Sequence, residues 1–396
     1  MTNILVMCIE PIPSAILGVY EPLLALSKHR ELQIKFIKTI DIRKADLEWC
    51  DTVIFIRSTE ELELRIAKAC KSSGKYLVYY LDDDLLNLPD LVNDARYYRD
   101  KTLQKNLIKI IETCNALWAV NPKIKEKYGK YTVKSVVTKG PAMLLNSGPM
   151  PAKNESPLVI GFAGSRDHAI TLDAVAGEAL KKISTEYGDK VRFEFLGAKP
   201  KIIDELDKSR YFPYIFDGAE YRKFMYNSNW SIGLAPLPCE DFFKRKYYNK
   251  FLEYGAIGCA GVYTDTEPFR YIVDDCVNGI LCRNTPDDWY NALKKLIDDS
   301  ELRKAIATNA RKLLEDGYTE LSVGYEAIKA IPEIAEFASP TGKVRIFGLS
   351  PIQNQLLLWY NKALRLIKKY WFFSIFIIAF LAIKKVLRLT KIIKGW

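Results

Sequence analysis

Two stretches of alternating strand and helix patterns constrain the fold of this 396-residue chain more than any other feature. The first contains four apolar runs and two helical patterns, at residues 3–9, 32–39, 51–57 and 75–81 and at residues 21–28 and 61–73. The second begins at residue 158, after a Pro- and Ser-rich stretch at residues 146–157 that has no apolar periodicity. Strand–helix repetition predicts parallel sheets with right-handed crossovers. The sequence therefore predicts an α/β chain with two Rossmann-like domains.

The length of the chain agrees with this division, because 396 residues exceed what one ordinary hydrophobic core holds together. We expect a first domain, a linker, a second domain and a C-terminal tail, at residues 1–145, 146–157, 158–336 and 343–396. The second domain is expected to include a short strand at residues 214–216.

Several classes of protein are disfavoured by the composition. The eight cysteines form no C-x-x-C pair, and His29 and His168 are the only histidines, so neither a disulfide framework nor a zinc site is indicated. No secretory leader follows Met1, which favours a reducing cytosolic setting. The sequence also lacks the G-x-G-x-x-G motif typical of nicotinamide dehydrogenases.

The net charge of +10 comes from one end of the chain. Residues 337–396 contain eleven Lys and Arg and no Asp or Glu, which leaves 47 basic against 48 acidic residues elsewhere. A nearly neutral body argues against a general nucleic-acid-binding surface. It favours a localised anionic partner for the tail.

Residues 236–262 hold the most informative cluster of charges. An apolar run at residues 230–236 predicts a buried strand, and a helical pattern follows the next loop. In that pattern Lys246, Lys250 and Glu253 are spaced i, i+4 and i+7, which predicts that they share one helix face. One interpretation is a solvated face with a Lys–Glu pair. The other is a site beyond a strand's carboxyl end that neutralises a diphosphate and binds sugar hydroxyls.

The same pattern also resembles a known family. The series K-x-x-x-K-F-L-E-Y-G-A-x-G at residues 246–258 resembles the donor-binding half of GT-B glycosyltransferases, particularly the retaining enzymes of glycosyltransferase family 4. Segments that resemble the rest of that half are I-G-F-A-G-S-R-D-H, N-G-I-L-C and T-P-D-D-W, at residues 160–168, 278–282 and 285–289. The resemblance covers residues 158–314 well and the first half weakly. It implies two domains facing across a cleft, and a helical stretch that crosses back to the first domain.

The resemblance also implies roles for particular residues. Lys246, Glu253 and Asp83 are expected to be catalytic, the last from the acceptor side of the cleft. The donor diphosphate is expected to contact Gly164, Ser165, Arg166, His168, Asn249 and Lys250. The start of the helix after Ser165 offers backbone N–H groups to an anion. No metal cofactor is expected, since cations would stabilise the leaving diphosphate.

One departure from the family concerns its first acidic residue. The family has two glutamates eight positions apart, and position 245 of this chain holds Arg245. Glu240 is nearby but out of register, so the first acidic role is vacant or filled from elsewhere.

Asp82, Asp83 and Asp84 follow a predicted strand and allow three interpretations. The first is a strand-end loop in which one aspartate caps a helix and the others are solvated. The second is a Mg²⁺ or Mn²⁺ site, as in the metal-dependent GT-A glycosyltransferases. The third, which we favour, places them on the acceptor side of the inter-domain cleft, where one orients or deprotonates an acceptor hydroxyl.

The tail predicts membrane association. Residues 370–383 are fourteen uncharged residues, fewer than the roughly twenty that a spanning helix needs. Basic and apolar helical patterns flank them, which is typical of a monotopic element lying in an anionic leaflet. The residues expected to contact the membrane are Lys368, Lys369, Trp371, Phe372, Phe373, Lys384 and Lys385.

Together these features predict a glycosyltransferase at the cytoplasmic face of the cell membrane. Its expected partners are a nucleotide-sugar donor, a lipid-linked or other saccharide acceptor and an anionic membrane surface, but no nucleic acid. A complex with other enzymes of polysaccharide assembly is compatible with this. Two alternatives stay open: a metal-dependent GT-A-type transferase using Asp82–Asp84, and a catalytically silent, membrane-tethered GT-B scaffold.

Overall fold

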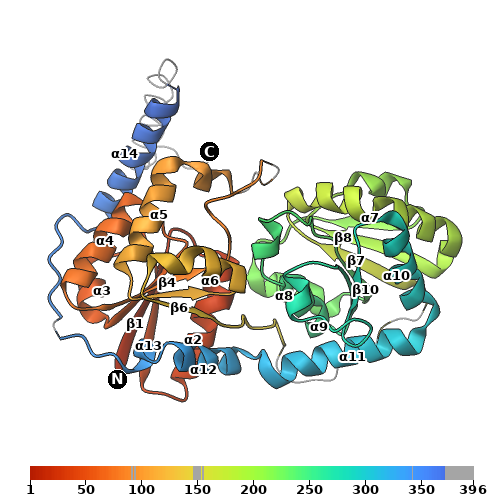
Figure 1. The fold of residues 1–396 in the computed structure, drawn as a ribbon, viewed down its shortest axis with the longest axis horizontal. Coiled ribbons are helices and arrows are strands. Elements are labelled where there is room, and N and C mark those ends of the chain that lie inside the picture. Colours follow the sequence, from red (N-terminus) through yellow and green to blue (C-terminus); the bar gives the residue numbers. More distant parts are fainter. Residues whose placement is uncertain (91, 93–94, 146–152, 154–155, 341, 371–396) are drawn as a thin grey trace.

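Two α/β domains, each built on its own six-stranded parallel sheet, make up the body of the molecule (Figure 1). The computed structural model describes residues 1–370, except residues 91, 93–94, 146–152, 154–155 and 341. Most of the predicted linker therefore lies outside the described residues. So do five of the predicted membrane contacts, namely Trp371, Phe372, Phe373, Lys384 and Lys385.

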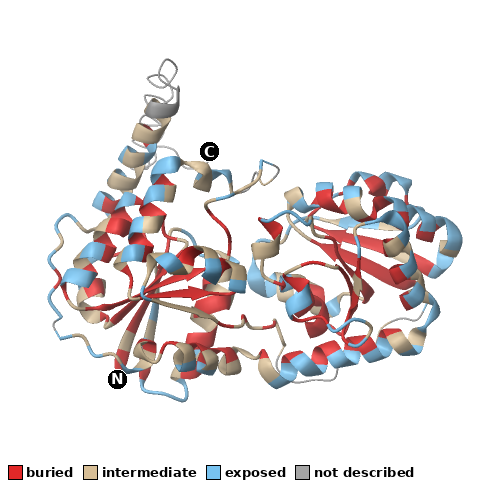
Figure 2. Ribbon diagram, in the orientation of Figure 1, coloured by how far each residue is buried: buried red, intermediate tan, exposed pale blue. Residues whose placement is uncertain are grey.

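The first domain has the strand order β2-β1-β3-β4-β5-β6. Its strands are β1 (Thr2–Cys8), β2 (Leu32–Lys38), β3 (Thr52–Ile56), β4 (Tyr76–Leu81), β5 (Ala116–Ala119) and β6 (Lys134–Val137). Its helices are α1 (Pro13–Ala15), α2 (Glu21–Ser27), α3 (Lys44–Trp49), α4 (Glu61–Ser72), α5 (Lys101–Thr113) and α6 (Pro122–Tyr128). β3, β4 and β5 are buried along their whole length, as expected for parallel strands covered by helices on both faces (Figure 2).

The second domain has the order β12-β11-β10-β7-β8-β9. Its strands are β7 (Leu158–Ala163), β8 (Val191–Leu196), β9 (Ser209–Phe212), β10 (Trp230–Ala235), β11 (Ala260–Thr264) and β12 (Ile280–Cys282). Its helices are α7 (Arg166–Tyr187), α8 (Gly218–Asn227), α9 (Asn249–Ala256), α10 (Pro286–Asp298) and α11 (Ser300–Gly317). The predicted strand at residues 214–216 is wrong, because the strand ends at Phe212 and a loop follows it.

After α11 the chain returns to the first domain through α12 (Glu320–Ala330) and α13 (Glu333–Glu336). Gly324 packs so closely on α2 that an added Cβ would lie 2.5 Å from the carbonyl oxygen of Pro22. The Thr2 hydroxyl donates to the Ala335 carbonyl at 2.8 Å, and Lys134 pairs with Glu333 at 2.8 Å. The two domains are therefore joined at residues 138–157 and again at the end of α11.

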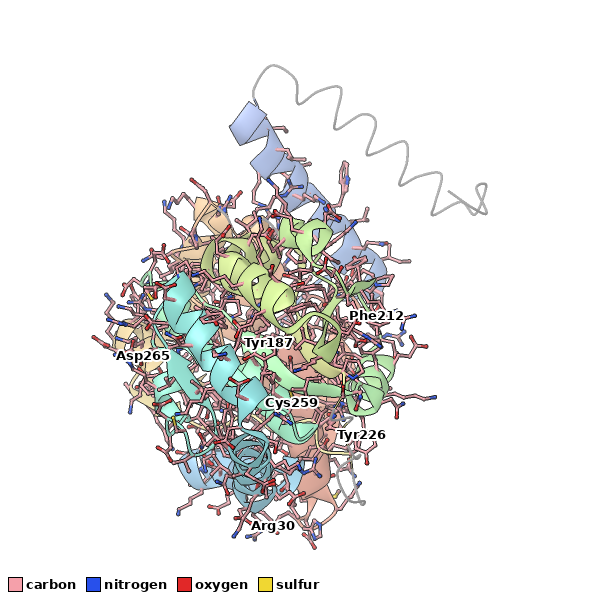
Figure 3. All side chains as sticks on the ribbon, turned by 90° about the vertical axis from the view of Figure 1, so that its right-hand side faces the viewer. Arg30, Tyr187, Phe212, Tyr226, Cys259 and Asp265 are labelled. Carbon is pink, nitrogen blue, oxygen red and sulfur yellow. The ribbon has the colours of Figure 1, made fainter. Side chains whose placement is uncertain are left out.

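The last described helix, α14 (Pro351–Tyr370), is anchored to the first domain along one side. The Asn354 side chain donates to the carbonyls of Ile40 and Ile42 at 3.2 and 2.8 Å. About three turns further along the same helix face, both terminal nitrogens of Arg365 bind the Glu60 carboxylate at 2.8 Å. α14 nevertheless projects beyond the body of the protein (Figures 1 and 3). Among the described residues, no helix is long and apolar enough to cross a membrane.

Candidate active site

Helix α9 carries two of the charged residues predicted from the sequence. Lys250 and Glu253 form an ion pair with 2.6 Å between Nζ and Oε2, and their side chains are 20% and 15% exposed. Lys246, in contrast, lies before the helix with extended backbone angles (φ −66°, ψ 162°). The prediction that all three residues share one helix face is therefore wrong. Asn249, the first residue of α9, is exposed.

Two glycines fix where α9 lies. A Cβ on Gly255 would lie 2.7 Å from Leu314 Cδ1, so this glycine allows α11 to approach the helix closely. The helix ends further on, where Gly258 has a positive φ of 66°. The Tyr254 hydroxyl donates to the Leu234 carbonyl at 2.5 Å, which ties the helix to the end of β10. Lys250 and Glu253 are therefore held at the carboxyl edge of the second sheet.

The loop before α9 is bonded to the first domain. Lys246 Nζ lies 2.7 Å from Oδ2 of Asp83, which follows β4 in the first domain. The Asn121 side chain donates to the carbonyls of Lys244 and Lys246 at 3.1 and 2.7 Å. The Gly140 N–H donates to the Tyr247 hydroxyl at 2.6 Å. Lys246 and Asp83, both predicted to be catalytic, thus meet across the domain boundary.

Each of the three consecutive aspartates has its own cation. Asp82 accepts two hydrogen bonds from Arg57, at 2.6 and 2.7 Å. Asp83 pairs with Lys246, and its second cation, Arg57, is 3.9 Å away. Asp84 is fully buried and accepts from Lys127 at 2.7 and 2.6 Å. Because separate ammonium and guanidinium groups already neutralise these carboxylates, the three residues do not fit a shared divalent cation.

The charge state of Asp82 follows from this pairing. Burial opposes its ionisation, but the charge of Arg57 and its hydrogen bonds outweigh that cost, so the pKa of the Asp82 carboxyl is lowered. Arg57 itself has a positive φ of 46°, an unfavourable conformation for a residue with a side chain.

Across the described part of the chain, no group of three His, Cys, Asp or Glu side chains is arranged to hold a metal ion.

The start of α7 carries the other predicted donor contacts. The Ser165 N–H donates to His168 Nδ1 at 3.2 Å, which leaves Nε2 as the hydrogen-bearing nitrogen of the neutral ring. Although His168 is an exposed residue, partial loss of hydration, followed by the charges of Lys250 and Lys246, lowers its pKa. A Cβ on Gly164 would lie 2.8 Å from His168 Nδ1, so this ring lies directly over the Gly164 backbone.

The predicted residues thus lie around the same sheet edges, although Arg166, His168 and Asn249 are exposed there. Lys250 and Lys246 are close enough to His168 to shift its pKa, and Lys246 also affects Asp82. The ends of β4, β7 and β10 therefore bring these charges together from both domains. Arg166 and Asn249 lie at exposed helix starts.

Sequence reasoning missed two residues of this group. In α8, burial, followed by the negative charge of Glu253, raises the pKa of Tyr221 well above its ordinary value, so Tyr221 is a neighbour of Glu253. No pattern in the sequence marks Tyr221. Arg57, however, is the first charged residue after the apolar strand β3, at the same sheet edge as Asp82. A charged residue directly after an apolar strand is a pattern from which Arg57 could have been predicted to lie near Asp82.

Arg245 does not take over the missing acidic role. Its guanidinium is 2.8 Å from Asp241 Oδ2 and 3.6 Å from Asp84 Oδ2. It therefore adds positive charge beside the aspartates, where the family has a glutamate.

Comparison with known proteins agrees with this architecture. Residues 250–313 match the family model described as "Glycosyl transferases group 1". A glycosyltransferase from Rickettsia africae has a TM-score of 0.63 and 13% identity, with 85% of this chain and 99% of that chain covered. Anabaena HepE in complex with UDP has a TM-score of 0.59 and 12% identity, with 84% and 100% covered.

A third solved structure, described as a UDP-N-acetylglucosamine 2-epimerase from Listeria monocytogenes, has a TM-score of 0.54 and 11% identity, with 86% and 98% covered. No curated protein sequence matches the chain. Structural neighbours at such low identity show the fold, whereas the family match concerns the segment that holds Lys250 and Glu253. The chain has the GT-B fold, and its donor half resembles the group 1 glycosyltransferases.

Proposed function

We propose that this protein transfers a sugar from a nucleotide-diphosphate-sugar to an acceptor with retention at the anomeric carbon. The observation that carries the proposal is the Lys250–Glu253 ion pair on α9 at the carboxyl edge of the second sheet, with Lys246 held just before the helix by Asp83 of the first domain. A leaving diphosphate needs several fixed positive or hydrogen-bond-donating groups, and this is where an open α/β sheet binds anions.

The proposed roles follow from the geometry. Lys250 and the Nε2–H of His168 bind the diphosphate, with the N–H groups at the start of α7 and Arg166 beside them. Glu253, held by its ion pair with Lys250, accepts from hydroxyls of the ribose or the donor sugar. Lys246 is paired with Asp83, so its ammonium reaches the leaving group only if it binds Asp83 and the diphosphate at the same time or moves away from Asp83. Asp83, once released, orients the acceptor hydroxyl from the first domain.

No metal cofactor is part of the proposal. In the GT-A alternative Asp82–Asp84 would hold a divalent cation, whereas here Arg57, Lys246 and Lys127 occupy those carboxylates in a two-domain GT-B fold. The second candidate is a catalytically silent scaffold. It is favoured by Arg245, which stands where the family has its first acidic residue.

Nucleotide binding tests the donor site. The full-length protein is expected to be stabilised against heat by one of UDP, GDP, dTDP or CDP, because a ligand that binds only the folded state raises Tm. The shift should persist in EDTA and disappear in Lys250→Ala. A shift that requires Mg²⁺ or Mn²⁺ would contradict the metal-free mechanism. Nucleotide binding without turnover of any sugar donor would favour the scaffold.

The acceptor is proposed to be a lipid-linked saccharide at the cytoplasmic face of the membrane. α14 supports this proposal, because Ile352, Leu356 and Tyr360 on its outer side are 68%, 50% and 54% exposed. Its inner side is fixed to the first domain by Asn354 and Arg365. In the sequence, the basic residues Lys368, Lys369, Lys384 and Lys385 come after this anchored part of α14. A peripheral, monotopic attachment there would confine acceptor and enzyme to one surface.

Vesicle flotation checks the membrane proposal. The full-length protein is expected to float with vesicles containing phosphatidylserine and to remain unbound to pure phosphatidylcholine, because each basic residue near an anionic surface contributes about 1 kcal/mol. Ile352→Ser/Leu356→Ser should weaken flotation, and Leu313→Ser, at an exposed leucine of α11, serves as the control. Equal binding to both vesicle types would contradict the electrostatic part of the proposal.

A further inference from the structure

One arginine of α14 contacts two separate segments of the first domain. Both terminal nitrogens of Arg365 bind the buried carboxylate of Glu60, which directly precedes α4. Its Nε lies 3.8 Å from Oδ2 of Asp100, the residue that directly precedes α5. Its guanidinium carbon lies 5.8 Å from the ring centroid of Tyr97, and the Tyr97 hydroxyl donates to the same Glu60 carboxylate. Arg365 therefore holds the start of α4 and the start of α5 together.

The two segments that Arg365 joins are the ends of two loops at the carboxyl edge of the first sheet. One loop leads from β3 to α4, and it begins with Arg57 and ends with Glu60. The other leads from β4 to α5, and it begins with Asp82 and ends with Asp100. β3 and β4 are neighbouring parallel strands, so both loops leave the same edge. Each loop thus has a charged residue of the acceptor side at one end and a contact of α14 at the other.

The first loop is bonded into a single unit. The Glu63 carboxylate in α4 accepts from the N–H groups of Thr59 and Glu60 at 2.7 and 2.9 Å. It also accepts from the Ser58 hydroxyl at 2.9 Å. Arg57 directly precedes these residues and has the positive φ of 46° that only a well-supported backbone retains. A displacement of Glu60 is therefore transmitted to Arg57.

The second loop approaches Arg57 through two tyrosines. The rings of Tyr97 and Tyr98 meet edge to face, with centroids 5.1 Å apart and an interplanar angle of 80°. Burial raises the pKa of Tyr98 to about 12, and the charge of Arg57 opposes this rise, so the two residues are neighbours. Arg57 in turn lies 3.9 Å from Asp83. Both loops thus connect α14 to the carboxylate proposed to orient the acceptor hydroxyl.

Attachment of α14 to the first domain does not require this arrangement. Asn354 already fixes the helix to the carbonyls of Ile40 and Ile42. A buried ion pair adds little net stability, because both groups lose their hydration. The place of Arg365, between two loops that begin at acceptor-side charges, is therefore better explained by the geometry that it imposes on them.

We propose that Arg365 is a positioning residue of the acceptor site. It holds the two loops, and through them Arg57 and Asp83, in the arrangement that receives the acceptor. The inference rests on the proposed transferase function, and it gives the helix proposed to bind the membrane a second role in the reaction. Lys250 and Glu253 belong to the second domain, so the donor site does not depend on Arg365.

Sugar transfer to membranes prepared from the source organism tests this role. With the radiolabelled nucleotide-sugar that the native full-length protein turns over, Arg365→Ala is expected to lower the rate at limiting membrane concentration by up to about 10²-fold, the typical cost of misplacing a reacting group by about 1 Å. Arg365→Lys should restore part of the rate. The Kd of the nucleoside diphosphate, measured by isothermal titration calorimetry, and flotation with phosphatidylserine vesicles should both be unchanged.

Two further variants separate positioning from attachment and from folding. Arg65→Ala is the matched control, because the Arg65 guanidinium donates to the Phe347 carbonyl at 3.1 Å and so attaches the segment before α14 to α4 rather than to either loop. Its transfer rate should be native. Glu60→Gln/Arg365→Met removes both charges, so no buried charge is left without a partner. This double variant is expected to keep the native Tm and still lose transfer.

The outcomes distinguish this role from the proposed function. If the native protein transfers no sugar to the membranes, the proposed membrane acceptor fails and the role of Arg365 fails with it. If the native protein is active and Arg365→Ala or the double variant transfers at the native rate, the positioning role alone is rejected. A parallel loss of transfer and of nucleotide affinity in Arg365→Ala would also reject it, because Arg365 would then support the whole fold rather than the acceptor side.

Discussion

Replacing Lys250 by alanine is expected to lower kcat/KM for the nucleotide-sugar by about 10²- to 10³-fold, the typical cost of removing one group that stabilises developing charge. In the native protein the Lys250 ammonium is held in place by its ion pair with Glu253 and lies near His168. Breaking the sugar–phosphate bond increases negative charge on the diphosphate. A cation already fixed at this position stabilises that charge without reorganisation.

Steady-state kinetics with the matching nucleotide-sugar measures this effect. Lys181→Ala is a suitable control, because Lys181 also pairs with a glutamate at 2.6 Å but lies on an exposed part of α7. Lys250→Arg should retain part of the activity, since the charge is kept while its position changes. If Lys250→Ala turns over at the native rate and keeps its Tm, Lys250 does not contact the leaving group.

The sheets could be predicted from the sequence because their strands are continuous apolar runs. Residues 75–81 are one such run, and the corresponding strand, β4, is completely buried. The same reasoning placed a strand at residues 214–216, where the aromatic residues are exposed instead. Apolar composition alone does not separate a buried strand from an exposed aromatic loop, because both are rich in large side chains.

The candidate site was harder to predict, because its partners come from distant parts of the chain. Helical spacing placed Lys246 beside Lys250, but the helix begins only at Asn249, and Lys246 pairs instead with Asp83, 163 residues away. The sequence grouped Asp82, Asp83 and Asp84 as neighbours, which left a metal site open. Their separation onto Arg57, Lys246 and Lys127 depends on tertiary contacts that no local pattern contains.

The GT-B fold does not decide the reaction by itself. Structures described as a glycosyltransferase and as a 2-epimerase both align with at least 85% of this chain. Function therefore depends on the side chains at the sheet edges. In the proposed mechanism, the Lys250–Glu253 pair at the carboxyl edge of the second sheet acts on the donor, and Asp83, paired with Lys246 across the domain boundary, acts on the acceptor.

Asp84→Ala is expected to lower the free energy of unfolding of the first domain by about 3–5 kcal/mol, as happens when one partner of a buried ion pair is removed. Asp84 is 0% exposed and accepts hydrogen bonds from Lys127 and from the Tyr128 hydroxyl at 2.6 Å. Arg245 of the second domain lies 3.6 Å away. Removing the carboxylate leaves two cations and a buried hydroxyl without their acceptor. Chemical denaturation, followed by fluorescence, measures the change in midpoint.

Asp287→Ala is the control for that substitution. Asp287 also binds one lysine, Lys182, at 2.8 Å, but its side chain is 81% exposed, so the expected loss is about 0–1 kcal/mol. Asp84→Asn should fall between the two, because its amide oxygen still accepts from Tyr128. If Asp84→Ala unfolds at the native midpoint but loses turnover, the carboxylate acts in the reaction. Asp84 and Asp83 would then have to exchange the structural and catalytic roles assigned to them.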